Sequence, residues 1–364
     1  MITPMKKLKV ALLGQGRSGY AIHGKHLLRD TERFEVAYVV EKLPERREKA
    51  ARVFGCETFE DYTALFGKEI DLVVNALPTP WHHPVTLDLL NHGFNVLCEK
   101  PATRSPELLD EMQAAAEAHG CMLAIFQQSR FAPYFQKVKS VLASGVLGRP
   151  VQISIAFNGY ARRWDWQCVQ DNIAGALYNT GPHPLDQALD LLGGEEMPNI
   201  FCKMDNANVF GDAEDYVKLI LTMPNKPLID LEISSCDGYP WGTYKIEGTR
   251  GALCGTQKEL HWKWFVESEA PERHQINTPL TTDAGEPAYC TEKLNWHEDS
   301  WVAGEGEDAF VDAVMTYYTM IYEHLTEGKP LKVTVKQVRR QLAVIEEAHR
   351  QNPMPKWPDA GMKR

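Results

Sequence analysis

The chain has 364 residues, 44% hydrophobic and 24% charged, as in a globular protein long enough for two domains. Its 39 Lys and Arg against 49 Asp and Glu give a net charge of −10, which argues against nucleic acid as a partner because phosphate binding needs a basic surface. No apolar run reaches the roughly 18 residues of a membrane span, and no signal peptide is recognisable at the start. The eight cysteines lie scattered without a CxxC pair, which predicts reduced thiols in a cytoplasmic protein and no metal site.

Residues 1–127 alternate short apolar runs with helical stretches. Strands are expected at Leu8–Leu13, Glu35–Val40, Asp71–Ala76, Asn95–Cys98 and Met122–Phe126. Helices are expected at Glu45–Phe54, Pro84–Asn91 and Pro106–His119, the last with Ser105 as its N-cap. Alternation at this spacing predicts an α/β domain with a parallel sheet and right-handed crossovers.

Residues 128–364 have a different pattern. Apolar and polar positions alternate in Val151–Phe157, Asp215–Thr222, Leu228–Ser234 and Thr243–Glu247, which is typical of an antiparallel sheet with one open face. Two helices are expected near the end, at Glu307–Glu327 and, after a Thr334 cap, at Val335–Gln351. The sequence therefore predicts a second, α+β domain.

A glycine-rich loop follows the first expected strand and opens a helix. It reads Gly14-Gln15-Gly16-Arg17-Ser18-Gly19, a GxGxxG pattern. Small residues let the backbone approach a pyrophosphate, and the helix N-terminus supplies free N–H groups. The alternative is a tight turn between strand and helix. We expect a dinucleotide at this loop, with Gly14, Gln15, Gly16, Ser18 and Gly19 as its binding residues.

Glu41 ends the second expected strand, where it can accept hydrogen bonds from the ribose hydroxyls of NAD and repel the 2′-phosphate of NADP. Lys42 and Arg46 could instead receive that phosphate. The sequence favours NAD over NADP, while Glu41 as a solvated strand end remains the alternative.

Lys100 follows the apolar run that ends at Cys98, in the triplet Glu99-Lys100-Pro101. Ligands of open parallel sheets bind beyond the carboxyl ends of the strands. An ammonium there can stabilise the alkoxide that develops as a hydride leaves a substrate, and Glu99 could orient it. A solvated surface lysine is the alternative, and only the position argues against it.

His183 lies at the start of an expected helix that carries Leu185, Leu189 and Leu192. The positive end of the helix dipole disfavours the imidazolium, so the ring is expected to stay neutral and able to accept a proton. Asn179, four residues earlier, could contact the same ligand. A structural histidine is the alternative.

The segment from Tyr160 to Gln167 is rich in aromatic and charged side chains. Aromatic faces stack on the C–H faces of sugars, and Asp or Arg binds hydroxyl groups, so this segment is a candidate substrate wall. Its candidate residues are Tyr160, Arg163, Trp164, Asp165 and Trp166. Packing of the tryptophans in a core or subunit interface is the alternative.

Together these motifs resemble the Gfo/Idh/MocA oxidoreductase family. The glycine loop, the run from Ala76 to His82, Glu99-Lys100-Pro101, and His183-x-x-Asp186 stand in family order. The resemblance implies a Rossmann domain over 1–127 and, over 128–364, an α+β domain whose large open, mostly antiparallel sheet often serves homo-oligomer contacts. It implies Lys100 and His183 as the catalytic pair and Asp186 as a residue that binds substrate or supports the site. It also implies a set of residues lining the dinucleotide: Leu77, Pro78, Thr79, His82, Glu99, Lys100 and Gln128.

One position departs from the family pattern, since Asn179 stands where the family commonly has Asp. A neutral amide cannot raise the basicity of His183 as a carboxylate would. The sequence around Asn179 resembles a branch of this family whose members act on glucosides. Some members of that branch oxidise the C3 hydroxyl of the sugar. The resemblance thus implies an NAD-dependent dehydrogenase for a sugar or glycoside. The alternatives are an NAD-recycling enzyme that cleaves glycosides through a transient keto sugar, an inositol or polyol dehydrogenase, and a non-enzymatic NAD-binding sensor.

Overall fold

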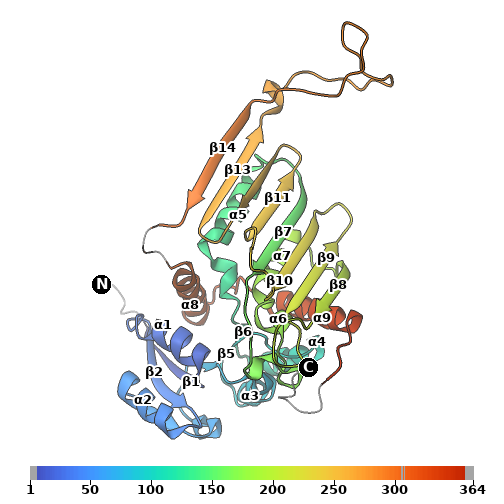
Figure 1. Cartoon of the computed structure of the whole chain (residues 1–364). Coiled ribbons are helices and arrows are strands. Elements are labelled where there is room, and N and C mark those ends of the chain that lie inside the picture. Colours follow the sequence, from blue (N-terminus) through green and yellow to red (C-terminus); the bar gives the residue numbers. More distant parts are fainter. Residues whose placement is uncertain (1–5, 305, 307, 357–364) are drawn as a thin grey trace, which may run out of the picture.

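The computed structural model describes residues 6–304, 306 and 308–356, which form two sheets with helices around them (Figure 1). The smaller sheet lies in the N-terminal half and the larger one in the C-terminal half. No helix in these residues is both long and apolar enough to cross a membrane.

The N-terminal sheet has six strands in the order β3-β2-β1-β4-β5-β6, all parallel. Its central strands are short apolar runs buried on both faces, as helix-covered parallel strands require. The strands are β1 (Leu8–Leu13), β2 (Phe34–Val40), β3 (Glu57–Phe59), β4 (Leu72–Asn75), β5 (Val96–Cys98) and β6 (Leu123–Ile125). The helices are η1 (Arg17–Gly24), α1 (Lys25–Leu27), α2 (Pro44–Phe54), α3 (His82–Asn91) and α4 (Pro106–His119). This order confirms the predicted Rossmann architecture.

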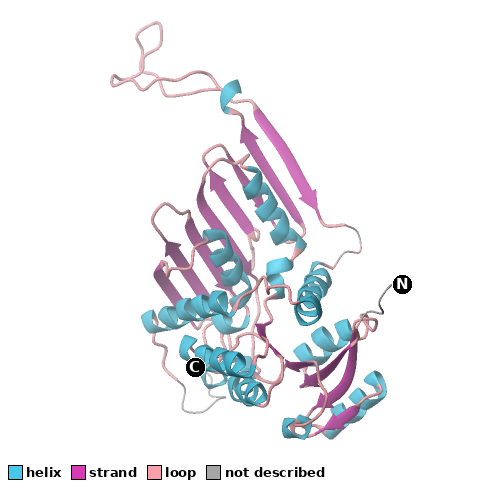
Figure 2. Ribbon diagram, turned by 180° about the vertical axis from the view of Figure 1, so that it is seen from behind, coloured by secondary structure: helices cyan, strands magenta, loops and turns pink. Residues whose placement is uncertain are grey.

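The C-terminal sheet has eight strands in the order β14-β13-β12-β11-β7-β10-β9-β8. Every pair is antiparallel except β7 with β10. The sheet is therefore mostly antiparallel, as the family resemblance implies. The strands are β7 (Pro150–Asn158), β8 (Asn199–Asp205), β9 (Tyr216–Thr222), β10 (Leu228–Ser234), β11 (Tyr244–Gly248), β12 (Gly251–Gly255), β13 (Glu259–Phe265) and β14 (Trp296–Val302). Seen from behind, α5 (Pro133–Ser144) and α7 (Pro182–Leu192) lie over one face of this sheet (Figure 2).

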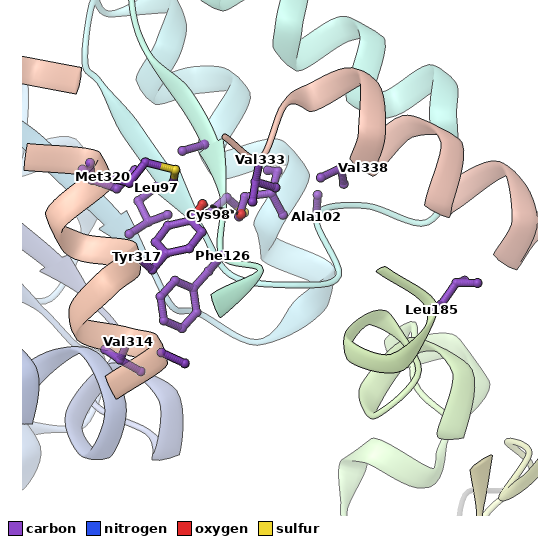
Figure 3. Packing of buried hydrophobic residues seen from close by; sticks show 14 of the residues in the cluster. Leu97, Cys98, Ala102, Phe126, Leu185, Val314, Tyr317, Met320, Val333 and Val338 are labelled. Atoms are coloured by element: carbon purple, nitrogen blue, oxygen red, sulfur yellow. Dashed lines mark hydrogen bonds between the residues drawn. The ribbon is translucent and has the colours of Figure 1, made fainter. Parts of the chain in front are cut away.

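The last two helices return to the N-terminal sheet. Tyr317, on α8 (Ala309–Glu327), donates a hydrogen bond of 2.6 Å to the carbonyl of Ile125 and packs edge-on against Phe126 at 5.0 Å (Figure 3). The other helix, α9 (Val335–Gln351), packs against α4 and begins with a capping box between Thr334 and Gln337. The two domains therefore share one continuous apolar core.

Three local expectations need correction. The side chain of Ser105 makes no capping hydrogen bond, although Ser105 does occupy the N-cap of α4. The helix after the glycine loop starts as the π-helix η1 and becomes α-helical only at Lys25. The helix expected from Glu307 begins at Ala309, and Glu307 itself lies outside the described residues.

Candidate active site

A cavity of about 1140 Å³ opens beyond the carboxyl ends of the N-terminal strands. Its walls come from the loops after β1, β2, β4 and β5 and from residues 163–183 of the C-terminal domain. Ligands of doubly wound sheets bind at this edge, so the topology alone makes the cavity the candidate site.

The glycine loop forms one end of the cavity. A Cβ atom at Gly19 would lie 1.9 Å from the carbonyl oxygen of Gly14, and one at Gly14 would lie 2.6 Å from that of Ala76. These two glycines are needed for close packing of loop, helix and strand. A Cβ at Gly16 would meet nothing within 4 Å, because Gly16 faces the cavity. No side chain caps the start of η1, so the loop fits the close backbone approach of a pyrophosphate.

Glu41 lies beside this loop and is buried. Its carboxylate accepts hydrogen bonds from the backbone N–H groups of Gln15 at 2.8 Å and Leu43 at 3.0 Å. Arg46 approaches the same carboxylate to 3.8 Å, and Lys42 lies over the ring of Trp81 at 5.4 Å. The carboxylate is thus fixed in place beside the glycine loop, with Arg46 close to it.

Lys100 lies at the centre of the cavity wall. Its Nζ donates a hydrogen bond of 2.9 Å to the backbone carbonyl of Asn179, which joins the loop after β5 to α6 (Ala176–Asn179). Burial lowers the pKa of Lys100, and the cations Arg17 and Arg163 lower it further, while Glu99 opposes them. The lysine is therefore half-buried, and among the described residues the carboxylate of Glu99 favours its ammonium form.

His183 lines the same cavity from the first turn of α7. Burial lowers the pKa of His183 to about 3, with the charge of Lys100 acting in the same direction. The ring is neutral at neutral pH, as the sequence predicts. Its Nδ1 is buried and has no hydrogen-bond partner among the described residues. An imidazole of this kind can accept a proton or a hydrogen bond from a ligand.

The substrate end carries a chain of polar side chains from the segment singled out above. Arg163 donates to Asp165 at 2.6 Å and also to Gln167. The amide of Gln167 then donates to the Oδ1 of Asn179 at 3.4 Å. Trp166 adds an aromatic face to the same wall. The charge of Arg163 is compensated within the protein, which leaves a neutral, hydrogen-bonding surface.

Three expected substrate residues lie elsewhere. Tyr160 and Trp164 are 67% and 80% exposed and are not among the residues lining the cavity. Asp186 is buried on α7 and forms a two-pronged ion pair with Arg130, at 2.7 and 2.5 Å. Of the two expected roles of Asp186, binding substrate or supporting the site, this pairing favours the supporting one, because both carboxylate oxygens already accept hydrogen bonds from the guanidinium.

The expected dinucleotide residues mostly line the cavity. Those that do are Gly14, Gly16, Ser18, Glu41, Lys42, Arg46, Leu77, Pro78, Thr79, His82, Glu99, Lys100 and Gln128. Gln15 and Gly19 do not, since Gln15 contributes its backbone N–H to Glu41 and Gly19 packs on Gly14.

Sequence reasoning missed other lining residues. Arg17 and Thr180 stand inside the glycine loop and the segment around Asn179, so the neighbouring site residues could have indicated that they line the cavity. Phe310 reaches the cavity from α8, more than 120 residues beyond His183. No local pattern marks such a residue, because only the packing of α8 brings it there.

Residues 8–127 match the model described as "Oxidoreductase family, NAD-binding Rossmann fold". Residues 135–254 match the model described as "GFO/IDH/MocA C-terminal domain". The two matches together span more than half of the chain.

Individual relatives agree with these matches. The chain is 26% identical over 358 residues to scyllo-inositol 2-dehydrogenase (NADP(+)) IolW of Bacillus subtilis, covering 94% of this chain and 92% of that protein. It is 27% identical over 259 residues to 2,7-anhydro-N-acetylneuraminate hydratase of Mediterraneibacter gnavus, covering 68% and 67%. The WlbA dehydrogenase of Bordetella pertussis, solved with NADH and UDP-GlcNAcA, has the same fold, with a TM-score of 0.73, 17% identity, and 96% of each chain covered.

Proposed function

Because the chain belongs to the Gfo/Idh/MocA family of NAD-binding oxidoreductases, we propose that it oxidises a secondary hydroxyl of a sugar or glycoside, with C3 of a glucoside favoured. The observation that carries the proposal is the meeting of Lys100 and His183 in one cavity with the glycine loop. A protein that only sensed NAD would need neither side chain.

The two side chains have complementary roles. The ammonium of Lys100 donates a hydrogen bond to the substrate oxygen and stabilises the negative charge that develops on it. The neutral ring of His183 accepts the hydroxyl proton. Bound NAD supplies the hydride acceptor, and the chain supplies orientation and electrostatics. The cofactor would be held by the glycine loop, Glu41 and the residues after β4.

The substrate wall supports an uncharged polyol. Arg163 is paired with Asp165, and Gln167 and Asn179 offer amide groups suited to hydroxyls. Trp166 supplies a face for stacking on sugar C–H groups. A glucoside matches these groups, and a free inositol or polyol is the second candidate, supported by the name of the B. subtilis relative.

A different reaction class also fits the same scaffold. In it NAD stays bound and is recycled while a transient keto sugar undergoes elimination, so that a glycoside is cleaved. The relative named as a hydratase supports keeping this alternative, because hydration and elimination are the same chemistry in opposite directions. Free NADH that accumulates with product indicates a dehydrogenase, whereas product without NADH indicates recycling.

The test is a screen of glucosides, sugars and inositols with purified protein, followed by NADH absorbance and product mass. With the best substrate, Lys100→Ala should lower turnover about 10²- to 10³-fold, the cost of removing one donor to a developing oxyanion. NAD affinity should change much less. Near-normal turnover of Lys100→Ala at saturating substrate would remove Lys100 from the mechanism.

The open face of the C-terminal sheet supports a homo-oligomer. Phe201 on β8 is 62% exposed there, within an otherwise alternating strand. A second copy of the chain would cover this face. Light scattering of the purified protein checks this, since a monomer at all concentrations contradicts it.

A further inference from the structure

Three buried polar side chains form a chain from the C-terminal domain to the active site. The hydroxyl of Tyr318 on α8 lies 2.8 Å from Nδ1 of His23, and Nε2 of His23 lies 3.1 Å from Oε1 of Glu99. Tyr318 and His23 are fully buried and Glu99 is 4% exposed. His23 comes from η1, and the proposed mechanism does not use it.

The partners fix where the protons lie. Donation from His23 lowers the pKa of Glu99 to about 2 against the opposing effect of burial, so Glu99 is ionised and can only accept. Nε2 of His23 must then carry the hydrogen. Burial raises the pKa of Tyr318 well above its usual value, so its hydroxyl keeps its proton and donates to Nδ1. With a hydrogen on Nε2 and an acceptor at Nδ1, the His23 ring satisfies both of its partners, and this tautomer is assigned from them.

Glu99 faces the proposed catalytic lysine. Its Oε2 accepts the backbone N–H of Lys100 at 3.0 Å. Its charge favours the ammonium of Lys100, while Arg17 on η1 and Arg163 in the C-terminal domain disfavour it. His82 on α3 also acts on Glu99, and His183 on α7 is in turn affected by Lys100. Glu99 is therefore the one acidic group among the charges that act on Lys100.

We propose that His23 is a positioning residue for Lys100: its Nε2–H, fixed by the Tyr318 hydroxyl, holds Glu99 ionised and directed at the lysine. Helix α8 of the C-terminal domain thereby sets the charge state of a residue in the Rossmann domain. The consequence for catalysis rests on the proposed role of Lys100. The effect on Lys100 itself does not, because it exists in the ligand-free protein.

The experiment measures the pKa of Lys100 directly in the full-length, ligand-free protein. Competitive labelling with acetic anhydride across pH 6–11, followed by mass spectrometry of the peptide containing Lys100, gives that pKa without any substrate. His23→Leu removes the donor to Glu99, and Glu99→Gln removes the charge. Both should lower the pKa of Lys100 by about one pH unit or more, as for loss of a nearby opposite charge.

Two further variants separate a positioning role from a merely structural one. His23→Gln keeps an N–H group near the position of Nε2. The pKa of Lys100 in this variant should therefore be closer to the wild-type value than it is in His23→Leu. Tyr318→Phe keeps the ring but frees Nδ1, so it should lower the pKa of Lys100 by less than His23→Leu does. The matched control is His26→Phe, because the ring of His26 packs against the same Tyr318 ring, with centroids 4.3 Å apart, but its Nε2 lies near Asp30 and not near Glu99.

The proposal is overturned if Glu99→Gln lowers the pKa of Lys100 while His23→Leu leaves it unchanged. If His23→Leu does not fold, Tyr318→Phe decides, and a wild-type pKa of Lys100 in that variant overturns the proposal. Should no sugar be oxidised, the labelling result still stands, so failure of the proposed function is distinguishable. If one is, the alkaline limb of its pH–rate profile should move to lower pH in His23→Leu but not in His26→Phe.

Discussion

Cofactor choice depends on Glu41 at the scale of single residues. Its carboxylate is held by two backbone N–H groups, in the position where we propose that the ribose of NAD binds and a 2′-phosphate would be repelled. We expect tighter binding of NAD than of NADP. Glu41→Ala should narrow the difference between the affinities for NAD and NADP. The variant weakens binding of the NAD ribose and removes the repulsion of the 2′-phosphate of NADP.

Titration of both cofactors against wild type and variant checks this prediction. Glu60→Ala is a suitable control, because Glu60 lines the same cavity but is paired with Arg47 at 3.6 Å. That variant should keep the wild-type ratio of the two affinities. A wild-type preference for NADP would show the prediction to be wrong.

His183 determines the acid side of the pH dependence. A base must be neutral to work, and the pKa of His183 is lowered to about 3. The oxidation rate of the wild type should therefore not vary between pH 5 and 7. Asn179→Asp adds a carboxylate, which stabilises the imidazolium and should bring an acid limb into this range.

Pre-steady-state rates of NADH formation at several pH values provide the measurement. His183→Ala should lower the rate about 10²- to 10⁴-fold, the usual effect of losing a general base. Asn179→Gln, which adds length but no charge, is the control. An unchanged profile in Asn179→Asp would mean that the side chain at 179 does not act on His183.

At the scale of elements, Asp186 joins α7 to the segment after β6 through Arg130. Asp186→Asn removes one of the two carboxylates that pair with the buried Arg130, because Asp190 also lies 3.3 Å from its guanidinium. The free energy of unfolding should fall by about 1.5–3 kcal/mol, the value of a hydrogen bond to a charged group, since Asp190 still offsets part of the charge. Urea unfolding measures it. While the protein stays folded, KM for the substrate should be unchanged, whereas a large rise in KM would return Asp186 to the substrate site.

Elements with a strong one-dimensional signal were predictable. The apolar run of β1 and the alternation of β10 were placed at the observed bounds, and α9 was placed from its Thr334 cap. The strands β3, β8, β12, β13 and β14 were missed. In β14 most residues are exposed, so the strand is defined by pairing with β13 and not by its own apolar pattern.

The site residues that lie next to elements with a clear sequence pattern were predictable, and those brought in only by tertiary packing were not. Lys100 and His183 stand in motifs beside recognisable elements, so the sequence could place them. His23 and Tyr318 are 295 positions apart, and their contact exists only because α8 packs on the Rossmann domain. No local pattern indicates that Trp164 is exposed and does not line the cavity, since exposure depends on tertiary packing.

At the scale of the whole molecule, the packing of α8 on the first domain buries an ionisable group. His26 is 7% exposed, and its ring stacks on Tyr318 of α8. Burial lowers the pKa of His26 to about 4, although Asp30 opposes the shift. In the unfolded chain a histidine titrates near 6.5. The joint between the domains is therefore a source of acid sensitivity.

The sign follows from proton binding. Between pH 6.5 and about 4 the unfolded chain binds a proton at His26 that the native protein does not bind. The contribution of His26 to stability is thus complete above pH 6.5 and is lost as the pH falls toward 4, by an amount on the order of 3 kcal/mol. His183 adds a loss of the same sign, because its pKa is also lowered. His349, whose pKa is raised, gives no slope below pH 6.5, since both states are protonated there.

His26→Phe keeps an aromatic ring against Tyr318 and removes the titrating group. The variant should lose less stability than the wild type between pH 6.5 and 4.5, and the remaining loss includes His183 and His82, since burial lowers the pKa of both. Urea unfolding at half-unit pH steps across this window measures both curves. Most of the stability lost at Glu99 falls below this window, because the pKa of its carboxyl is about 2 in the native protein and near 4.3 in the unfolded chain. If the two curves run parallel from pH 6.5 to 4.5, the domain joint does not carry the acid sensitivity, and its source lies elsewhere in the chain.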